Sequence, residues 1–164
     1  MLKLFTDGGV IKRNPSPYGG TYAWILVEDG EEVDNCYGTI FPKKMDSIFV
    51  TNNQTELYAV IQGLKSLYDD EIADICSDSN VTLGRLFRGS PFNNIPQWMQ
   101  KELARERSRL KNFNKFTYTL IGGHPTQREL EEGINEKGHP TSKWNVWCDE
   151  KCNEESMKYL ESLL

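Results

Sequence analysis

The hydrophobic pattern of this chain changes its period near Asn52, and this change constrains the fold more than any other feature. Before Asn52, apolar residues fall in short runs rich in aromatic and β-branched side chains, typical of strands, at 2–7, 21–28 and 33–41. Asp29-Gly30 separates the last two runs and favours a hairpin turn. From Asn52, helical spacing predicts one amphipathic helix carrying Leu57, Val60, Ile61, Leu64, Leu67 and Tyr68.

The second half of the chain alternates between helices and strands. Strands are predicted at 72–78 and 116–121, helices at 79–87, 96–111 and 144–164, and a polar loop at 124–142. This order predicts an α/β fold with a mixed sheet, in which the first three strands are antiparallel and the later ones are parallel across helical crossovers. A chain of 164 residues is expected to form a single domain over 1–164.

Composition and charge exclude several classes of function. No window holds the roughly 18 consecutive apolar residues of a membrane span, and the N-terminus turns acidic too early for a secretory signal, so we expect a cytoplasmic protein without a membrane partner. The net charge of -5 argues against a protein that coats nucleic acid non-specifically, so any such contact must be local. The four cysteines form no CxxC pair and are interpreted as structural thiols.

Three acidic residues are expected to meet at one edge of the sheet. Asp7 ends the first strand-like run and Asp78 ends the fourth, so their side chains emerge together if these strands are parallel neighbours. Glu56 lies in the first turn of the helix that begins near Asn52, at the flank of its apolar stripe. Clustered carboxylates repel one another unless a cation neutralises them, and ligand sets made only of oxygen suit Mg²⁺ or Mn²⁺.

Four segments resemble the motifs of type 1 ribonuclease H, in that family's order and over nearly the whole chain. They are Thr6-Asp7-Gly8-Gly9, Thr51-Asn52-Asn53-Gln54-Thr55-Glu56-Leu57, Ser77-Asp78-Ser79 and Asn145-Val146-Trp147-Cys148-Asp149. The second motif is fairly specific by itself, and the set of four is a strong signal. The resemblance implies a ribonuclease H-like five-stranded sheet of order 3-2-1-4-5 flanked by helices.

The same resemblance implies a function and assigns residues to it. Asp7, Glu56, Asp78 and Asp149 would be the catalytic acids that hold two Mg²⁺ ions, with Mn²⁺ as a substitute. The expected reaction is endonucleolytic hydrolysis of the RNA strand of an RNA/DNA hybrid, leaving 5'-phosphate and 3'-hydroxyl ends. The hybrid is the expected partner of a monomer that has no obligate protein partner.

Asn52 and Asn53 are implied to contact the hybrid in its minor groove, where 2'-hydroxyls distinguish RNA from DNA. For one of the two asparagines, simple capping of the helix is an equally good interpretation.

The family also places a catalytic histidine on a loop before its final aspartate, and both histidines of this chain are candidates. His124 directly follows the last strand, whereas His139 has the family's spacing to Asp149. We favour His124, because anchoring at a strand end fixes where a side chain can reach. Residues 125–140 then form an insertion into a tolerant loop.

A locally basic segment is predicted to bind phosphate, as a basic protrusion does in the family. It contains Trp98, Lys101, Arg105, Arg107, Arg109, Lys111 and Lys115. The alternative is ordinary intrahelical pairing with Glu102 and Glu106.

Three other readings are ranked lower. A zinc site of Cys148, Cys152 and His139 lacks a fourth ligand. A metal-dependent DNA nuclease of the same fold would generally lack the glutamate motif. A non-catalytic module that binds hybrids would usually have lost one of the acids.

Overall fold

The computed structural model describes residues 1–112 and 115–164, and its centre is a five-stranded sheet of order β3-β2-β1-β4-β5. The strands are β1 (Leu2–Val10), β2 (Gly20–Glu28), β3 (Glu31–Ile40), β4 (Ala73–Ser77) and β5 (Phe116–Leu120). β1 pairs antiparallel with β2 and parallel with β4, while β2–β3 is antiparallel and β4–β5 is parallel. The predicted mixed sheet and its strand order are therefore confirmed.

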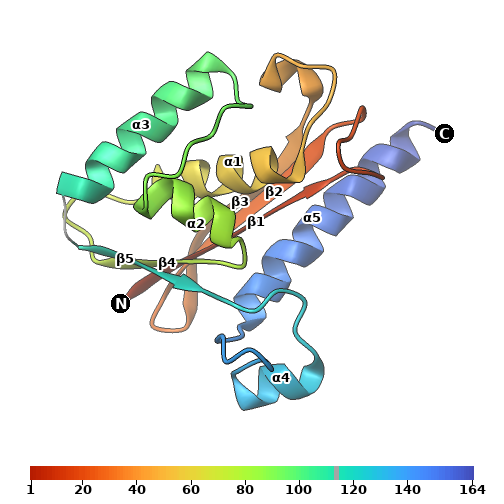
Figure 1. Cartoon of the computed structure of the whole chain (residues 1–164). Coiled ribbons are helices and arrows are strands. Elements are labelled where there is room, and N and C mark those ends of the chain that lie inside the picture. The colour runs from red at the N-terminus through yellow and green to blue at the C-terminus, as the bar shows by residue number, and fades with distance from the viewer. Residues whose placement is uncertain (113–114) are drawn as a thin grey trace.

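Helices cover both faces of the sheet (Figure 1). They are the short 3-10 helix η1 (Pro42–Met45) and the α-helices α1 (Asn52–Leu64), α2 (Asn80–Phe87), α3 (Gln97–Asn112), α4 (Gln127–Glu132) and α5 (Lys143–Ser162). α1, α2 and α3 lie on one face, and α5 lies on the other (Figure 1). No helix in the described part of the chain combines the length and apolar character that a bilayer crossing needs.

Alternating residues of the central strand supply two separate hydrophobic cores. Leu2 and Leu4 of β1 pack in the larger core with α1 and α3, whereas Phe5 packs in a smaller core against α5. This alternation follows from the period of two along a strand, which sends successive side chains to opposite faces. β1 therefore buries Leu2 and Leu4 on one face and Phe5 on the other, while Lys3 near its start stays exposed.

The cysteines are structural, as expected. Cys76, Cys148 and Cys152 are buried and Cys36 is partly exposed. The thiols of Cys148 and Cys152 lie against the carbonyl oxygens of Phe5 and Asp7, at 3.5 and 3.8 Å. Desolvation by burial raises the pKa of both thiols, which keeps them protonated.

Three local predictions were wrong. β1 does not end at Asp7 but continues to Val10, because β2 still pairs with it after its pairing with β4 has stopped at Phe5. α1 ends at Leu64, so Tyr68, which was predicted on its apolar stripe, lies beyond the helix and is 76% exposed. The predicted loop 124–142 contains α4, which Thr126 and Glu129 start with a capping box.

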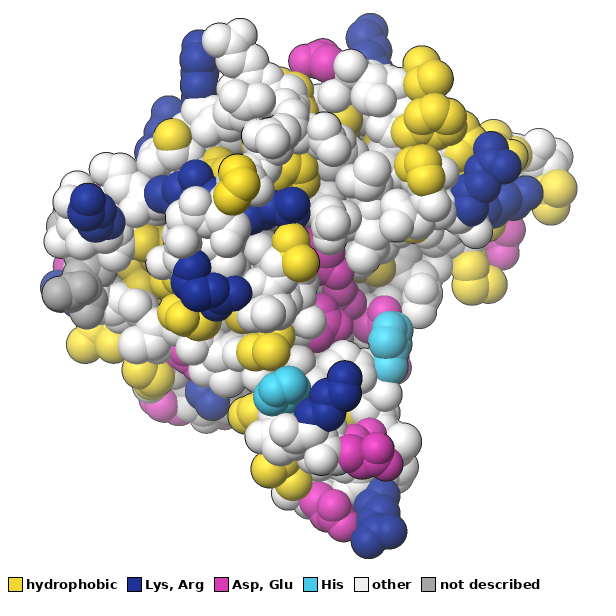
Figure 2. Space-filling view, viewed as in Figure 1, with side chains coloured by type: hydrophobic (Ala, Val, Ile, Leu, Met, Phe, Trp, Pro, Cys, Tyr) yellow, Lys and Arg dark blue, Asp and Glu magenta, His cyan; other side chains and the backbone are white. Residues whose placement is uncertain are grey.

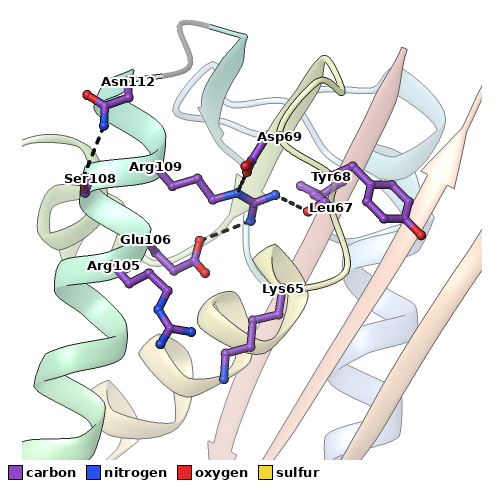
Figure 3. Close-up of a pocket in the computed structure, with 9 residues that line it drawn as sticks. All are labelled: Lys65, Leu67, Tyr68, Asp69, Arg105, Glu106, Ser108, Arg109 and Asn112. Carbon is purple, nitrogen blue, oxygen red and sulfur yellow. Dashed lines mark hydrogen bonds and ion pairs between the residues drawn. The ribbon is translucent and has the colours of Figure 1, made fainter.

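The basic segment has a structural role at two of its arginines. Arg109 of α3 pairs with Glu106 and Asp69 and donates a hydrogen bond to the carbonyl oxygen of Leu67 (Figure 3). It also donates a hydrogen bond to the carbonyl oxygen of Leu64. Its guanidinium thereby ties α3 to the last carbonyl of α1 and to a carbonyl in the turn that follows that helix. Arg107 similarly donates to the carbonyls of Arg85 and Ser90. These two side chains hold α3 in place, which contradicts a phosphate-binding role for them.

Candidate active site

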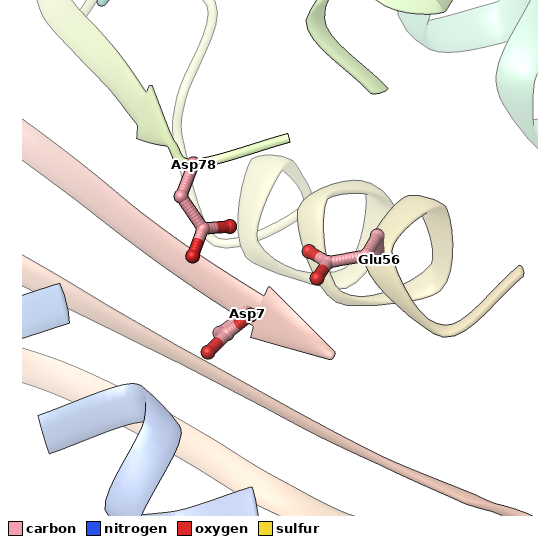
Figure 4. Close-up of side chains that lie close together, drawn as sticks. All are labelled: Asp7, Glu56 and Asp78. Atoms are coloured by element: carbon pink, nitrogen blue, oxygen red, sulfur yellow. The ribbon is translucent and has the colours of Figure 1, made fainter. Parts of the chain in front are cut away.

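Three carboxylates converge where β1, β4 and α1 meet. Asp7 lies on β1, Asp78 directly follows β4, and Glu56 lies on α1. One oxygen from each carboxylate can be chosen so that all three lie within 4.8 Å of one another (Figure 4). The predicted meeting of these acids is therefore found in the structure.

Local sequence explains this close approach. A Cβ atom on Gly8 would lie 2.5 Å from the backbone nitrogen of Glu56, a distance that real side chains do not tolerate. Glycine therefore lets β1 pass directly against the first turns of α1. The start of α1 is fixed by Thr51, whose side chain caps the helix while the Gln54 side chain accepts a hydrogen bond from the Thr51 backbone. Glu56 is consequently held over Asp7.

The cluster is electrostatically costly without a cation. Burial, followed by the charge of Asp78, raises the pKa of Asp7 to about 7. Burial and the charges of Asp7 and Asp78 raise the pKa of Glu56 well above its usual range. Burial also raises the pKa of Asp78, although His124 counteracts the rise. Three acids that resist ionisation together form a site that a positive charge would stabilise.

The residues fit a divalent cation of the hard type. Glu56 Oε2 is buried and has no hydrogen-bond partner, which is unfavourable for a carboxylate oxygen unless a ligand occupies that side. The converging donors are all carboxylate oxygens, the ligands preferred by Mg²⁺ and Mn²⁺. Asp7, Glu56 and Asp78 could therefore hold such an ion.

Asp149 and His124 complete a hollow of about 500 Å³ around the three acids. Figure 2 shows acidic side chains at the floor of this hollow and a histidine at its rim. Asp149 lies on α5, and His124 Nδ1 is 3.6 Å from Asp149 Oδ2. The His124 side chain is 82% exposed, so it can reach a bound molecule. His139 does not line this hollow but lines an adjoining one with Asp78.

The two asparagines before Glu56 are not helix caps. The N-cap of α1 is Thr51, and the backbone N–H of Asn52 donates to Asn14 Oδ1 at 3.1 Å. Asn52 is half-buried and lines the hollow, whereas Asn53 is exposed beside it. The capping interpretation is therefore wrong, and both amide side chains are available to a ligand.

Gly123 also lines the hollow, although the sequence analysis did not predict it as a site residue. A Cβ atom at this position would lie 2.7 Å from Asp78 Oδ2, so a larger residue here would push the carboxylate of Asp78 out of its position. The Gly122-Gly123 pair directly after a predicted strand was the available signal.

The sequence and the fold have counterparts among known proteins. The RNase H family model matches residues 1–156. A ribonuclease H of Caldanaerobacter subterraneus subsp. tengcongensis is 27% identical over 98% of this chain and 94% of its own length. The crystal structure of LC11-RNase H1 in complex with an RNA/DNA hybrid is similar with a TM-score of 0.64 at 17% identity, covering 98% of this chain and 99% of that one. RNase H1 of the archaeon Halobacterium salinarum is similar with a TM-score of 0.61 at 22% identity, covering 94% and 96%. This chain belongs to the RNase H family of hydrolases.

Proposed function

We propose that this chain is a metal-dependent endoribonuclease that hydrolyses the RNA strand of RNA/DNA hybrids and leaves 5'-phosphate and 3'-hydroxyl ends. The observation that carries the proposal is the convergence of Asp7, Glu56 and Asp78 within 4.8 Å in a hollow that also contains Asp149. Membership of the RNase H family and the hybrid bound to LC11-RNase H1 support the choice of substrate.

The four acids act as ligands and not as nucleophiles. Asp7, Glu56 and Asp78, together with Asp149 from α5, would hold two Mg²⁺ ions. When bound, such ions activate water and stabilise charge on the phosphate oxygens during phosphodiester hydrolysis. The protein contributes fixed positions, because Gly8 packs β1 on α1 and Gly123 confines Asp78.

The residues at the rim bind the hybrid and move a proton. Asn52 and Asn53 present amide groups that can hydrogen-bond base edges and 2'-hydroxyls in the minor groove. His124 is exposed and close to Asp149, and it lies in the short connection between β5 and α4. It is positioned to exchange a proton with a departing product oxygen, a step suited to imidazole near neutral pH.

Cleavage of an end-labelled RNA/DNA hybrid tests this proposal. The substrate is incubated with and without Mg²⁺, beside duplex DNA, duplex RNA and both single strands. We expect metal-dependent cutting of the RNA strand in the hybrid alone, and loss of cutting in Asp149→Asn but not in Glu161→Gln, an exposed acid near the end of α5. Cutting of duplex DNA would favour a DNA nuclease, and binding without cutting would favour a non-catalytic module.

A further inference from the structure

A second hollow, of about 360 Å³, adjoins the catalytic one and shares Asp78 and Gly123 with it. One wall of it comes from residues 125–140, here called the arm, which include α4 and contribute Glu129, Asn135, Glu136, Lys137 and His139. The arm projects beyond the sheet beside the site (Figure 1). The volume lies within the range of small-molecule binding sites, roughly 300 to 1,000 Å³. A nucleic-acid strand bound at the catalytic acids can therefore extend into this neighbouring space.

Hydrogen bonds hold the arm in a defined position. The backbone N–H groups of Lys137 and His139 both donate to Asn135 Oδ1, at 3.0 and 2.9 Å. At the base of the arm, Gly122 N–H donates to the Pro140 carbonyl at 2.8 Å. The Asn135 side chain also packs against Gly122, where a Cβ atom would lie 2.6 Å from its amide nitrogen. The residues that line the second hollow are thus fixed relative to Asp78.

Two potential cations of the arm line this hollow without a carboxylate partner. Lys137 forms no ion pair within residues 1–112 and 115–164, and neither does His139. Arg128, the arm's other cation, does not line the hollow and pairs with Glu132 at 2.9 Å. Glu129 also lines the hollow, and its carboxylate accepts hydrogen bonds from the backbone N–H groups of Thr126 and Glu136. These hydrogen bonds lower its pKa and keep it negatively charged.

We propose that the second hollow is a subsite for the cleaved strand, in which Lys137 and His139 contact the phosphate next to the scissile one. The inference rests on the proposed function and adds a specific contact to it. Lys137 supplies a point charge to a phosphate oxygen, and the imidazole N–H of His139 supplies a hydrogen bond. Glu136 also lines the hollow and opposes the same phosphate, so its removal should have the opposite effect.

Binding measurements without divalent cation test the subsite independently of catalysis. The Kd of a labelled hybrid is measured by fluorescence anisotropy over a range of salt concentrations. Lys137→Gln should raise the Kd about fivefold, the equivalent of one exposed ion pair, and should reduce the salt slope by about one. Glu136→Gln should lower the Kd, and Arg128→Gln, the matched control on the same arm, should leave it unchanged.

A chemical change in the substrate separates direct contact from a distorted arm. A neutral methylphosphonate replaces the RNA-strand phosphate on either side of the scissile phosphate, one position at a time. At one position the methylphosphonate should raise the Kd of the unchanged protein. It should not raise the Kd of Lys137→Gln any further, because this variant already lacks the contact. Equal losses for both proteins at every position, or equal effects of Lys137→Gln and Arg128→Gln, would overturn the subsite. The cleavage assay on unmodified hybrid decides the proposed function separately.

Discussion

Replacing Asp7 by Asn should stabilise the metal-free protein while it abolishes cleavage. Burial and the neighbouring carboxylates raise the pKa of Asp7 from 3.8 to about 7. At about 1.36 kcal/mol per pH unit, this rise of about three pH units corresponds to roughly 4 kcal/mol. The folded protein binds this proton more tightly than the unfolded chain does. The free energy of unfolding is therefore unaffected below about pH 4 and falls as the pH rises from about 4 to about 7.

Urea denaturation in the presence of EDTA measures this effect. Between pH 4 and pH 8, the free energy of unfolding of the unchanged protein should fall by up to about 4 kcal/mol because of Asp7, and that of Asp7→Asn should fall correspondingly less. Adding Mg²⁺ at pH 8 should stabilise the unchanged protein, because the cation binds the folded state and not the unfolded chain. Asp7→Asn, which lacks one ligand, should gain less. Glu161→Gln is the control, since this exposed acid lies outside the cluster.

Two results would refute the reasoning about Asp7. If Asp7→Asn were no more stable than the unchanged protein at pH 8 in EDTA, the carboxylate cluster would not be under the repulsion described. If Mg²⁺ stabilised both proteins equally, Asp7 would not be a ligand. Activity alone cannot separate these cases, because either loss of metal or loss of folding would stop cleavage.

Three further substitutions test other parts of the structure. Gly8→Ala should destabilise the protein by about 1 to 3 kcal/mol and lower kcat, because the added methyl group meets the backbone of α1. Urea denaturation and an activity assay measure the two effects, and unchanged stability would contradict the close packing. Arg109→Met should lower the free energy of unfolding by about 3 to 5 kcal/mol in a thermal denaturation experiment, since it leaves the buried carboxylate of Glu106 without its ion pair. Arg105→Met, at an exposed position on the same helix, is the control and should change stability by less than about 0.5 kcal/mol. His124→Ala should lower kcat on the hybrid with stability unchanged within about 0.5 kcal/mol, and full activity would remove His124 from the mechanism.

The sheet and its acids were predictable because they follow from short-range patterns. Apolar runs that end in Asp7 and Asp78 indicate strands with acids near one edge, and helical spacing after Asn52 places Glu56 over them. The strand order and the position of Asp149 came from the resemblance to ribonuclease H. Long-range pairing decides such features, and no local pattern in the sequence shows it.

Two of the errors share one physical cause, which is that tertiary contacts overrode local propensity. β1 runs beyond Asp7 because β2 continues to pair with it, and this register is invisible in the strand's own residues. Arg109 was predicted to bind phosphate, yet the carboxylate of Glu106 and the carbonyls of Leu64 and Leu67 hold it. α4 was missed because its six residues are too few to show a period, although Thr126 and Glu129 form a recognisable capping box.

The arm leaves and returns to the protein at almost the same point, since Gly122 N–H donates to the Pro140 carbonyl at 2.8 Å. A closed base of this kind makes the intervening segment interchangeable, because the entropy of closing a loop depends only weakly on its length. Sequences of different length could be grafted between His124 and Pro140 without disturbing β5, α5 or the residues that line the catalytic hollow. The arm is therefore a natural place to vary which nucleic acids the enzyme accepts while its catalytic acids stay the same.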